Sequence, residues 1–229
     1  MDIRMYDTMT SIPLFLGMNA QDLHTVIEKS NMQIQLVEAG DVLALQGERC
    51  GRLTILLRGD LAVETQMEDK ALMVEETLQG AAVLEPDSLY GLGRRWKSTY
   101  RARTECQMME IPKDSVSRLI AGFEIFRINF LNLLSTLAAR RHQQTWSLPE
   151  MNNRRRLVHF LFTHTLYNRE GRKVYHARME DLGHYLGVTR SLVGKMLGEL
   201  QAAGLLTYDR NLVEVNDVTQ LFNEIYGTT

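Results

Sequence analysis

The chain has 229 residues, 45% of them hydrophobic, and a formal net charge of -2 at pH 7. At roughly 100 to 200 residues per domain, this length predicts two domains with real cores. No apolar run approaches the ~20 residues that cross a bilayer, and the polar start MDIRMYD has no signal-peptide core. We therefore expect a cytoplasmic protein without a membrane partner.

Cysteine usage and charge distribution narrow the class further. Cys50 and Cys106 are isolated, so neither a disulfide framework nor a four-thiolate metal site is indicated. An iron-sulfur cluster held by cysteine alone is excluded for one chain. Residues 1–148 carry 16 positive and 19 negative side chains, whereas residues 149–229 carry 10 and 9. The net charge of the C-terminal part is therefore slightly positive, which is the sign that DNA binding requires.

The first 111 residues predict a helix followed by a β-roll. Residues 10–30 contain a short turn and then an amphipathic helix, with Asn19 and Asp22 near its start. From Met32 to about Ile111, apolar and polar residues alternate in short runs separated by glycines. This pattern is typical of many short antiparallel strands that form a compact β-roll or barrel.

A long helix is predicted next. Pro112 to Ile120 reads as a helical turn with a break at Gly122, and Phe123 to Leu148 has a helical pattern without Gly or Pro, closed by Pro149. An apolar stripe follows it with coiled-coil spacing: Phe126, Phe130, Leu133 and Leu137. We expect this stripe to form a dimer interface, although the chain's own β-roll is an alternative partner for one face.

Residues Arg178 to Leu205 predict two short helices that meet at Gly187, the outline of a helix-turn-helix. Gly187 would supply the left-handed turn, Thr189 would cap the second helix, and Gly183 would lack the bulk that holds the helices apart. Leu205 to Val215 then alternates about a polar centre, as a two-stranded wing would.

The outward face of the second helix carries chemistry suited to nucleic acid. Arg190, Ser191 and Lys195 offer guanidinium, hydroxyl and ammonium groups, which match guanine edges and phosphates. The alternative is an ordinary helical hairpin whose charges are merely solvated. The wing pattern favours the DNA-binding interpretation.

The predicted fold class is α+β in three parts. Residues 1–122 form a β-roll sensor domain, residues 123–148 a dimerisation helix, and residues 149–229 a C-terminal winged helix-turn-helix domain.

In this order of parts, the chain resembles the CRP/FNR family of bacterial transcription regulators. The matching segments are IPLFLGM at 12–18, EAGDVLALQGE at 38–48, LLRGDLAV at 56–63 and LGVTRSLVGKMLGELQAAGL at 186–205. The resemblance implies an N-terminal domain like those that bind cyclic nucleotides and a C-terminal DNA-binding domain.

The resemblance also implies which residues contact DNA. The family's base-reading arginine falls on Arg190 and its later basic reader on Lys195, while the acidic residue that often lies between them is Ser191 here. Arg154 falls where the family often touches phosphate. With Thr189, these residues form the predicted contact set, but the serine means that the half-site cannot be borrowed from other members.

The effector segment departs from the pattern of members that bind cyclic AMP. The chain has Leu84 where glycine lets the backbone approach the phosphate, and Pro86 has no amide hydrogen to donate. We therefore do not expect cyclic nucleotide binding, although cations nearby could attract an anion. The candidate effector-pocket residues are Glu85, Arg94, Arg95, Trp96, Ser98 and Thr99.

Haem is the candidate cofactor that remains. No cysteine precedes Cys50, which argues against the iron-sulfur cluster of the oxygen-sensing branch of the family. The LEP…LYG stretch resembles a subgroup of regulators linked to nitrosative stress, and some members of that subgroup bind haem and respond to nitric oxide. Candidate ligands are His24, His142, Met67, Met73, Met108 and Met109, although methionines in strands are usually core residues and exposed histidines are common.

We expect a homodimeric regulator, not an enzyme, that binds a pseudo-palindromic duplex and responds to a small signal. No P-loop, HExxH or nucleophile–base arrangement is evident. An activator would also need a surface for RNA polymerase. The alternatives are a ligand-binding module that acts on a protein partner and a regulator that needs no effector.

Overall fold

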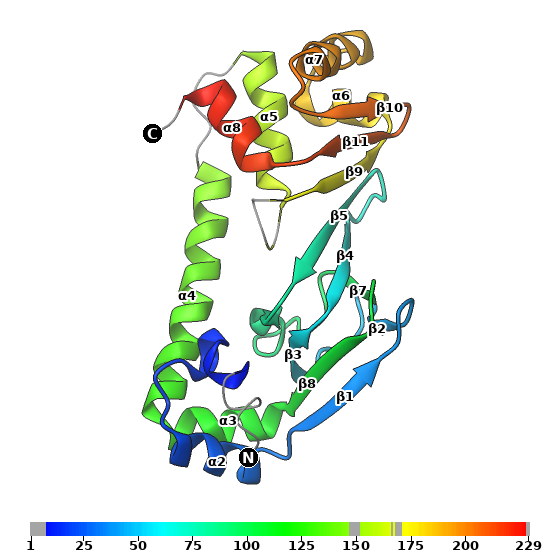
Figure 1. The fold of residues 1–229 in the computed structure, drawn as a ribbon. Helices are drawn as coiled ribbons and strands as arrows, with labels where there is room; N and C mark the ends of the chain where they lie inside the picture. Colours follow the sequence, from blue (N-terminus) through cyan, green and yellow to red (C-terminus); the bar gives the residue numbers. More distant parts are fainter. Residues whose placement is uncertain (1–7, 147–151, 166, 168–170, 228–229) are drawn as a thin grey trace. The chain divides into compact units, whose positions relative to one another are not determined.

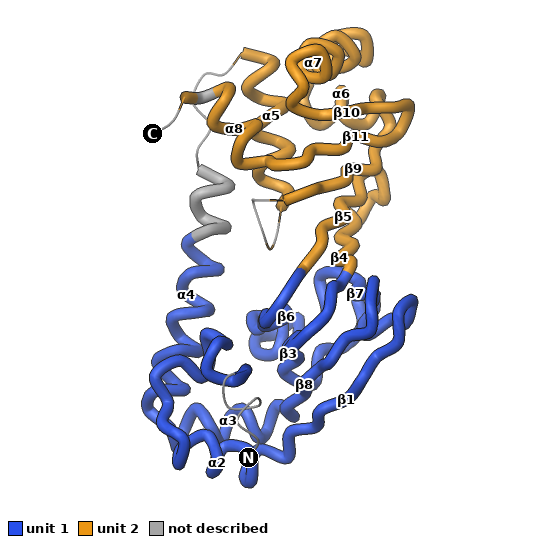
Figure 2. The backbone as a smooth tube through the Cα atoms, in the orientation of Figure 1, with its two compact units in different colours: residues 1–61, 79–143 blue, residues 62–78, 144–229 orange. Residues whose placement is uncertain are grey.

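The computed structural model describes residues 8–146, 152–165, 167 and 171–227. By their contacts, residues 1–61 and 79–143 form one compact unit, unit 1, and residues 62–78 and 144–229 form another, unit 2 (Figures 1 and 2). The expected helix stop at Pro149 lies outside the described residues.

Unit 1 holds most of the β-roll. Its four-stranded antiparallel sheet has the order β1-β8-β3-β6, and a second pair joins β2 to β7. β3 lies inside the roll, and its run Leu53 to Leu57 is buried on both faces, unlike the half-buried alternation expected there. The strands are β1 Gln33–Val37, β2 Val42–Ala44, β3 Arg52–Arg58, β6 Ala82–Leu84, β7 Thr99–Ala102 and β8 Cys106–Pro112.

Helices complete unit 1. The Asn19 side chain accepts a hydrogen bond from the Asp22 backbone amide at 2.8 Å and so caps α2, at the helix start that the sequence predicts. The helices are η1 Pro13–Phe15, α2 Ala20–Lys29, η2 Pro86–Ser88, α3 Lys113–Gly122 and α4 Glu124–Trp146, the last of which extends past the unit boundary.

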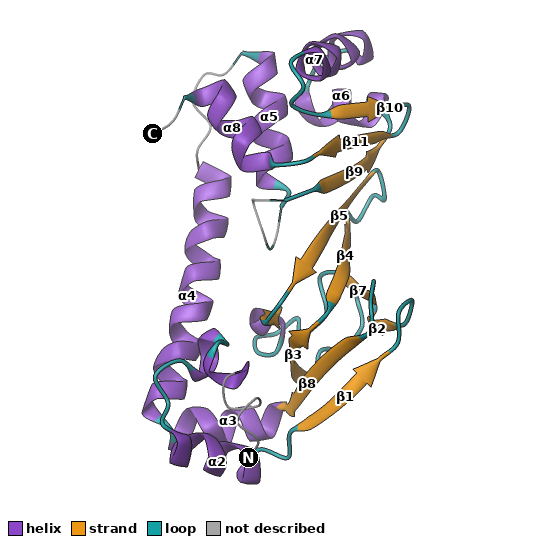
Figure 3. Cartoon of the chain, in the orientation of Figure 1, coloured by secondary structure: helices purple, strands orange, loops and turns teal. Residues whose placement is uncertain are grey.

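Unit 2 is a winged helix-turn-helix with an added β-hairpin. It contributes the strands β10-β11-β9-β5-β4, in that order, to a seven-stranded sheet that continues with β7 and β2. Four helices pack on these five strands (Figure 3). The hairpin of β4 and β5 comes from the middle of the predicted β-roll sequence. The elements are β4 Asp60–Gln66, β5 Leu72–Gln79, α5 Asn153–Thr163, β9 Lys173–Ala177, α6 Met179–Leu186, α7 Arg190–Ala202, β10 Thr207–Asp209, β11 Leu212–Val215 and α8 Val218–Tyr226.

These elements confirm the predicted α+β class, with a β-roll, a long helix and a winged helix-turn-helix in that order. Within the described residues, no single helix has the length and apolar character of a membrane span. The segments Lys113–Gly122 and Glu124–Ala139 meet the length and composition criteria only when they are taken together, and the two are bent by 117°.

Candidate nucleic-acid interface

The turn between α6 and α7 is built by local hydrogen bonds. Gly187 has φ +65°, a left-handed conformation that most side chains avoid, and the Val188 amide donates to the Gly183 carbonyl at 2.9 Å. The Thr189 hydroxyl accepts from the Leu192 amide at 3.4 Å and caps α7. The turn and the cap predicted at these residues are confirmed.

Gly183 of α6 lies directly against the backbone of the turn that leads to α7. A Cβ atom built there would lie 2.7 Å from the Val188 backbone oxygen. We expect Gly183→Ala to lower the free energy of unfolding by about 1–3 kcal/mol, because backbone must move to admit the methyl group. Denaturant unfolding followed by circular dichroism measures the change.

Gly194, on α7, is the matched control. A Cβ there meets nothing within 4 Å. Gly194→Ala should raise stability by about 0.5–1 kcal/mol, because alanine is the better helix former. If both variants shifted the unfolding midpoint in the same direction, the close approach at Gly183 would not limit the packing of the motif.

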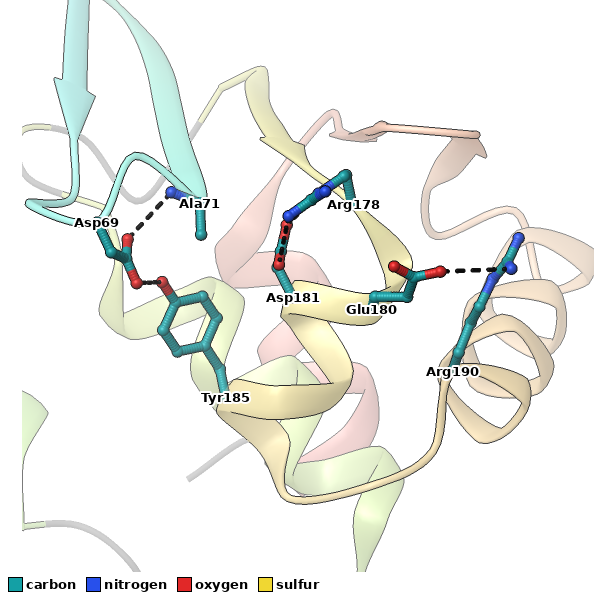
Figure 4. A network of polar contacts seen from close by, with 7 residues as sticks. All are labelled: Asp69, Ala71, Arg178, Glu180, Asp181, Tyr185 and Arg190. Atoms are coloured by element: carbon teal, nitrogen blue, oxygen red, sulfur yellow. Dashed lines mark hydrogen bonds and ion pairs between the residues drawn. The ribbon is translucent and has the colours of Figure 1, made fainter.

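The predicted readers lie on the first two turns of α7 and are exposed. Arg190, Ser191 and Lys195 all point to solvent, as does Thr189 at the cap. Nη1 of Arg190 lies 3.6 Å from Oε1 of Glu180 on α6, and the two side chains are 72% and 64% exposed (Figure 4). An ion pair this exposed contributes only about 0–1 kcal/mol, so Arg190 is oriented without being locked.

Glu180 is a site residue that the sequence analysis missed. It lies ten positions before Arg190 and approaches it only because the turn at Gly187 folds α6 against α7. A second ion pair at the start of α6 is bidentate: Arg178 donates to both carboxylate oxygens of Asp181, at 2.7 and 3.1 Å. The start of α6 and the start of α7 therefore carry both acidic and basic side chains, and this surface is not uniformly basic.

Arg154 lies at the start of α5, where the Asn152 side chain caps the helix by accepting from the Arg155 amide at 2.9 Å. The Arg154 side chain is partly exposed, and its Nε has no hydrogen-bond partner among the described residues. A guanidinium next to the positive end of a helix dipole suits a phosphate oxygen.

The wing forms where it was predicted. β10 and β11 pair in antiparallel register from Thr207 opposite Glu214 to Asp209 opposite Leu212, which leaves Arg210 and Asn211 in the turn. Arg172 braces the hairpin through two hydrogen bonds to Glu214, at 2.5 and 2.9 Å. The hydrogen bonds with Arg172 lower the pKa of the Glu214 carboxyl.

Several side chains of the candidate effector segment are buried and make contacts within that segment. Glu85 is 6% exposed and accepts hydrogen bonds from the Ser88 hydroxyl at 2.8 Å, the Lys97 amide at 2.8 Å and the Tyr100 hydroxyl at 3.0 Å. Its backbone is left-handed, with φ +32°. Trp96 is buried edge-on against Tyr100, with ring centroids 5.4 Å apart.

The remaining polar groups of this segment also have partners inside the unit. Arg95 donates to the Gly47 carbonyl at 2.6 Å, Thr99 accepts from the Gln46 amide at 3.1 Å, and Lys97 is paired with Asp87. Ser98 is fully buried, and Arg94 is partly exposed. The structure therefore brings the six predicted pocket residues together, with most of their polar groups already engaged.

The candidate haem ligands are scattered. Met108 and Met109 are fully buried in β8, His24 lies on α2 beside Glu28, and Met67 packs on the core of unit 2. Met73 is partly buried on β5, and the side chain of His142 lies outside the described residues. The described candidates therefore lie on different elements of both units.

Both cysteines are buried and unbridged. Burial raises the pKa of the Cys50 thiol and that of the Cys106 thiol, because an apolar environment disfavours the thiolate. Among the described residues, no group of three or more His, Cys, Asp or Glu side chains is placed to hold a metal ion.

The stripe on α4 that the sequence predicts as a dimer interface is partly buried within the chain itself. Phe126 and Phe130 are 0% and 3% exposed and pack inside unit 1, against Phe15 at 5.7 Å and Tyr90 at 5.9 Å between ring centroids. Leu133 and Leu137 continue that face and are partly exposed. Phe126 and Phe130 are therefore buried against unit 1 of the same chain, the alternative partner for this face.

A different face of α4 is open. Ile125, Ile128 and Leu131 are 38%, 47% and 56% exposed in the described chain. They follow one another at steps of three, so they lie along one side of the helix. Asn129 lies on the inner side and donates to the Leu14 and Leu16 carbonyls, at 3.2 and 2.8 Å.

Comparison with known families agrees with this architecture. The family described as cyclic nucleotide-binding domain matches residues 34–123, and the one described as Crp-like helix-turn-helix domain matches residues 155–223. The chain belongs to the CRP/FNR family. This is a family of transcription regulators and not of enzymes, which confirms the resemblance inferred from the sequence.

Individual relatives are distant. The anaerobic regulatory protein of Pasteurella multocida is 29% identical over 125 residues, or 52% of this chain and 45% of that protein. The protein of the same name from Haemophilus influenzae is 27% identical over 135 residues, or 56% of this chain and 51% of that protein. The chain thus spans about half the length of these curated relatives.

Among solved structures, OCPA-complexed CprK, in a cysteine-to-serine variant, aligns with a TM-score of 0.50 and 15% identity. The alignment covers 87% of this chain and 91% of that one. At this identity the likeness shows the fold alone.

Proposed function

We propose that this chain is a homodimeric, sequence-specific DNA-binding transcription regulator whose β-roll detects a small signal. The observation that carries the proposal is the exposed start of α7. There a capped helix presents Arg190, Ser191 and Lys195 to solvent, beyond a glycine turn that packs it on α6. Arginine and lysine at the N-terminal end of such a helix are suited to guanine edges and phosphates in the major groove.

A two-fold dimer is part of the proposal. The exposed side of α4 at Ile128 and Leu131 supplies apolar surface of the kind that a symmetric helix pair buries. In a symmetric dimer, two recognition helices read half-sites one DNA turn apart, ~34 Å. The operator would then be pseudo-palindromic.

DNA selection tests the proposal directly. The full-length protein is incubated with a random duplex library, and bound sequences are recovered and amplified. The expected product is a two-fold symmetric motif with half-site centres about 10 base pairs apart. Recovery of unenriched sequence, with binding that depends only on total charge, would favour the alternative of a module acting on a protein partner.

Cyclic AMP is not expected to bind. The carboxylate of Glu85 and the cations of Arg95 and Lys97, which would hold a ribose and a phosphate, are engaged within unit 1. A ligand would have to break those contacts, leaving buried polar groups without partners. Calorimetry and the fluorescence of buried Trp96 should both stay flat; a saturable change at one ligand per chain would contradict this.

Haem with nitric oxide remains the signal that the family resemblance favours. Anaerobic titration with haem, followed by nitric oxide, distinguishes this signal from others by absorption. A Soret band at unit stoichiometry would support it despite the scattered ligands, whereas a featureless titration and unchanged DNA affinity would favour a different signal or an effector-independent regulator.

A further inference from the structure

The hairpin of β4 and β5 adds its strand β5 to the sheet of the winged helix-turn-helix in unit 2. β5 pairs with β9 in antiparallel register over five residues, from Leu72 opposite Ala177 to Glu76 opposite Lys173. The chain enters unit 2 at residue 62, returns to unit 1 at residue 79 and enters unit 2 again at residue 144. A segment of the sensor half of the sequence therefore becomes a strand of the winged-helix sheet (Figures 1 and 2).

The pairing is reinforced by a buried core. Leu72 and Val74 are 0% and 3% exposed and belong to the same apolar cluster as Tyr175, Leu182 and Leu186. These residues come from β5, β9 and α6, so the first helix of the helix-turn-helix rests on a core to which the hairpin contributes. Undocking would expose both apolar side chains, at a cost that favours the docked state.

A buried ion pair fixes the register. Lys173 Nζ lies 3.6 Å from Glu76 Oε1, and each side chain is 1% exposed. Glu76 also accepts from the Tyr167 amide at 3.3 Å. Burial lowers the pKa of Lys173, and Glu76 opposes that effect. Replacing either residue alone by a neutral one would leave the other charge buried without its counter-charge, which is strongly unfavourable.

The tip of the hairpin reaches the helix-turn-helix itself. The Tyr185 hydroxyl on α6 donates to the carboxylate of Asp69, which also accepts from the Ala71 amide at 3.0 Å (Figure 4). The shared proton raises the pKa of Tyr185 to about 12 and lowers that of Asp69. The contact is therefore intact between the usual pKa values of the two groups, 3.8 and 10.0, and is lost as the pH falls through the Asp69 pKa or rises through the Tyr185 pKa.

The docked hairpin leaves the reading face open. Its contacts with the winged helix-turn-helix include the pairing with β9 and the hydrogen bond from Tyr185 on α6, whereas Arg190 and Lys195 on α7 are exposed. A segment that blocked DNA would be expected to cover those side chains. The arrangement instead favours a role in holding the motif.

We propose that the hairpin, residues 62–78, is a latch that positions the helix-turn-helix for a two-half-site operator by adding a strand to the DNA-binding unit. The inference rests on the proposed function. A unit that began at residue 144 would have one covalent connection to unit 1, whereas unit 2, which also incorporates residues 62–78, has three. Restraint lowers the entropic cost of engaging both half-sites at once and does not alter contacts within one half-site.

A cross-link tests the sign of the effect. Met73 and His176 are directly opposite in the register, and opposed residues of antiparallel strands lie within the Cα separation that a disulfide spans. In the double variant Met73→Cys/His176→Cys, oxidation should leave affinity for the selected two-half-site duplex unchanged or raise it. Weaker binding after oxidation, restored by reduction, would overturn the proposal and indicate autoinhibition.

A single-atom change tests the tip. Tyr185→Phe keeps the ring, which stacks on Phe160 at 5.7 Å, and removes the hydroxyl that reaches Asp69. We expect two-half-site affinity to fall about two- to tenfold, the range for one hydrogen bond, with single-half-site affinity unchanged. Glu68→Gln, which removes a charge from the exposed neighbour of Asp69, is the control and should change neither.

The remaining outcomes are also decisive. Equal affinities for Tyr185→Phe and the control, or equal losses on both duplexes, would overturn the latch. If the wild-type protein bound no DNA, the proposed function would fail separately, and amide hydrogen exchange would still test the latch. Tyr185→Phe should speed exchange in β9, residues 173–177, and unchanged exchange there would contradict the latch.

Discussion

Replacing Arg190 by alanine is expected to weaken binding to the selected operator by about 1–3 kcal/mol, roughly 5- to 150-fold. The guanidinium is exposed, lies in the first turn of α7, and within the described residues makes one weak ion pair, with Glu180. If it donates two hydrogen bonds to a guanine, the loss is concentrated at one base pair, and discrimination relaxes there. Fluorescence anisotropy with the operator and with single-base variants measures both effects.

Lys195, one helical turn further along α7, provides a comparison within the same interface. If it contacts phosphate, Lys195→Ala should weaken all sequences alike and lower the salt slope by about one. Lys29→Ala removes the same charge from an exposed position at the end of α2 and should leave affinity unchanged. If Arg190→Ala behaved like the Lys29 control, α7 would not be the reading helix.

Leu131→Asp is expected to convert the proposed dimer to monomers at micromolar concentration. Leu131 is 56% exposed on the open side of α4, next to Ile128 at 47%. Burying a leucine contributes about 1.5–3 kcal/mol, and two-fold symmetry counts the loss twice. Two aspartates facing each other add repulsion. Sedimentation or light scattering measures the mass, and anisotropy the loss of two-half-site binding.

Leu92→Asp makes the same substitution at a fully exposed loop residue of unit 1 and is the control. It should leave both mass and DNA affinity unchanged. A Leu131→Asp protein that remained dimeric would place the interface elsewhere, and Leu133 with Leu137 would be the next positions to test. A monomeric wild-type protein would remove the dimer from the proposal altogether.

Local structure was predicted well because its causes lie within a few residues. Asn19 and Thr189 cap helices through their own side chains, and Gly187 takes the left-handed turn that only its missing Cβ permits at low cost. The wing followed from alternation about a polar turn. The family resemblance pointed to the same residues of α7.

The packing partner of the α4 stripe could not be predicted from the spacing of its residues. Spacing of four and three residues correctly indicates that Phe126 and Phe130 are buried, but periodicity carries no information about the partner. Phe15 and Tyr90, distant in sequence, take those positions, and the open face is the one at Ile125, Ile128 and Leu131.

The order of the parts, the helix-turn-helix with its turn and cap, and the departure at Leu84 and Pro86 could be predicted without the structure, since each depends on propensity, patterning or motif residues close together in the chain. The open face of α4, the donors to Glu85 and the pairing of β5 with β9 became known only from the folded chain. These depend on contacts between segments that are distant in the sequence, such as Asp69 with Tyr185 at a separation of 116 residues. Strand pairing and burial are settled by the complementarity of whole surfaces, and no local pattern encodes the identity of a distant partner.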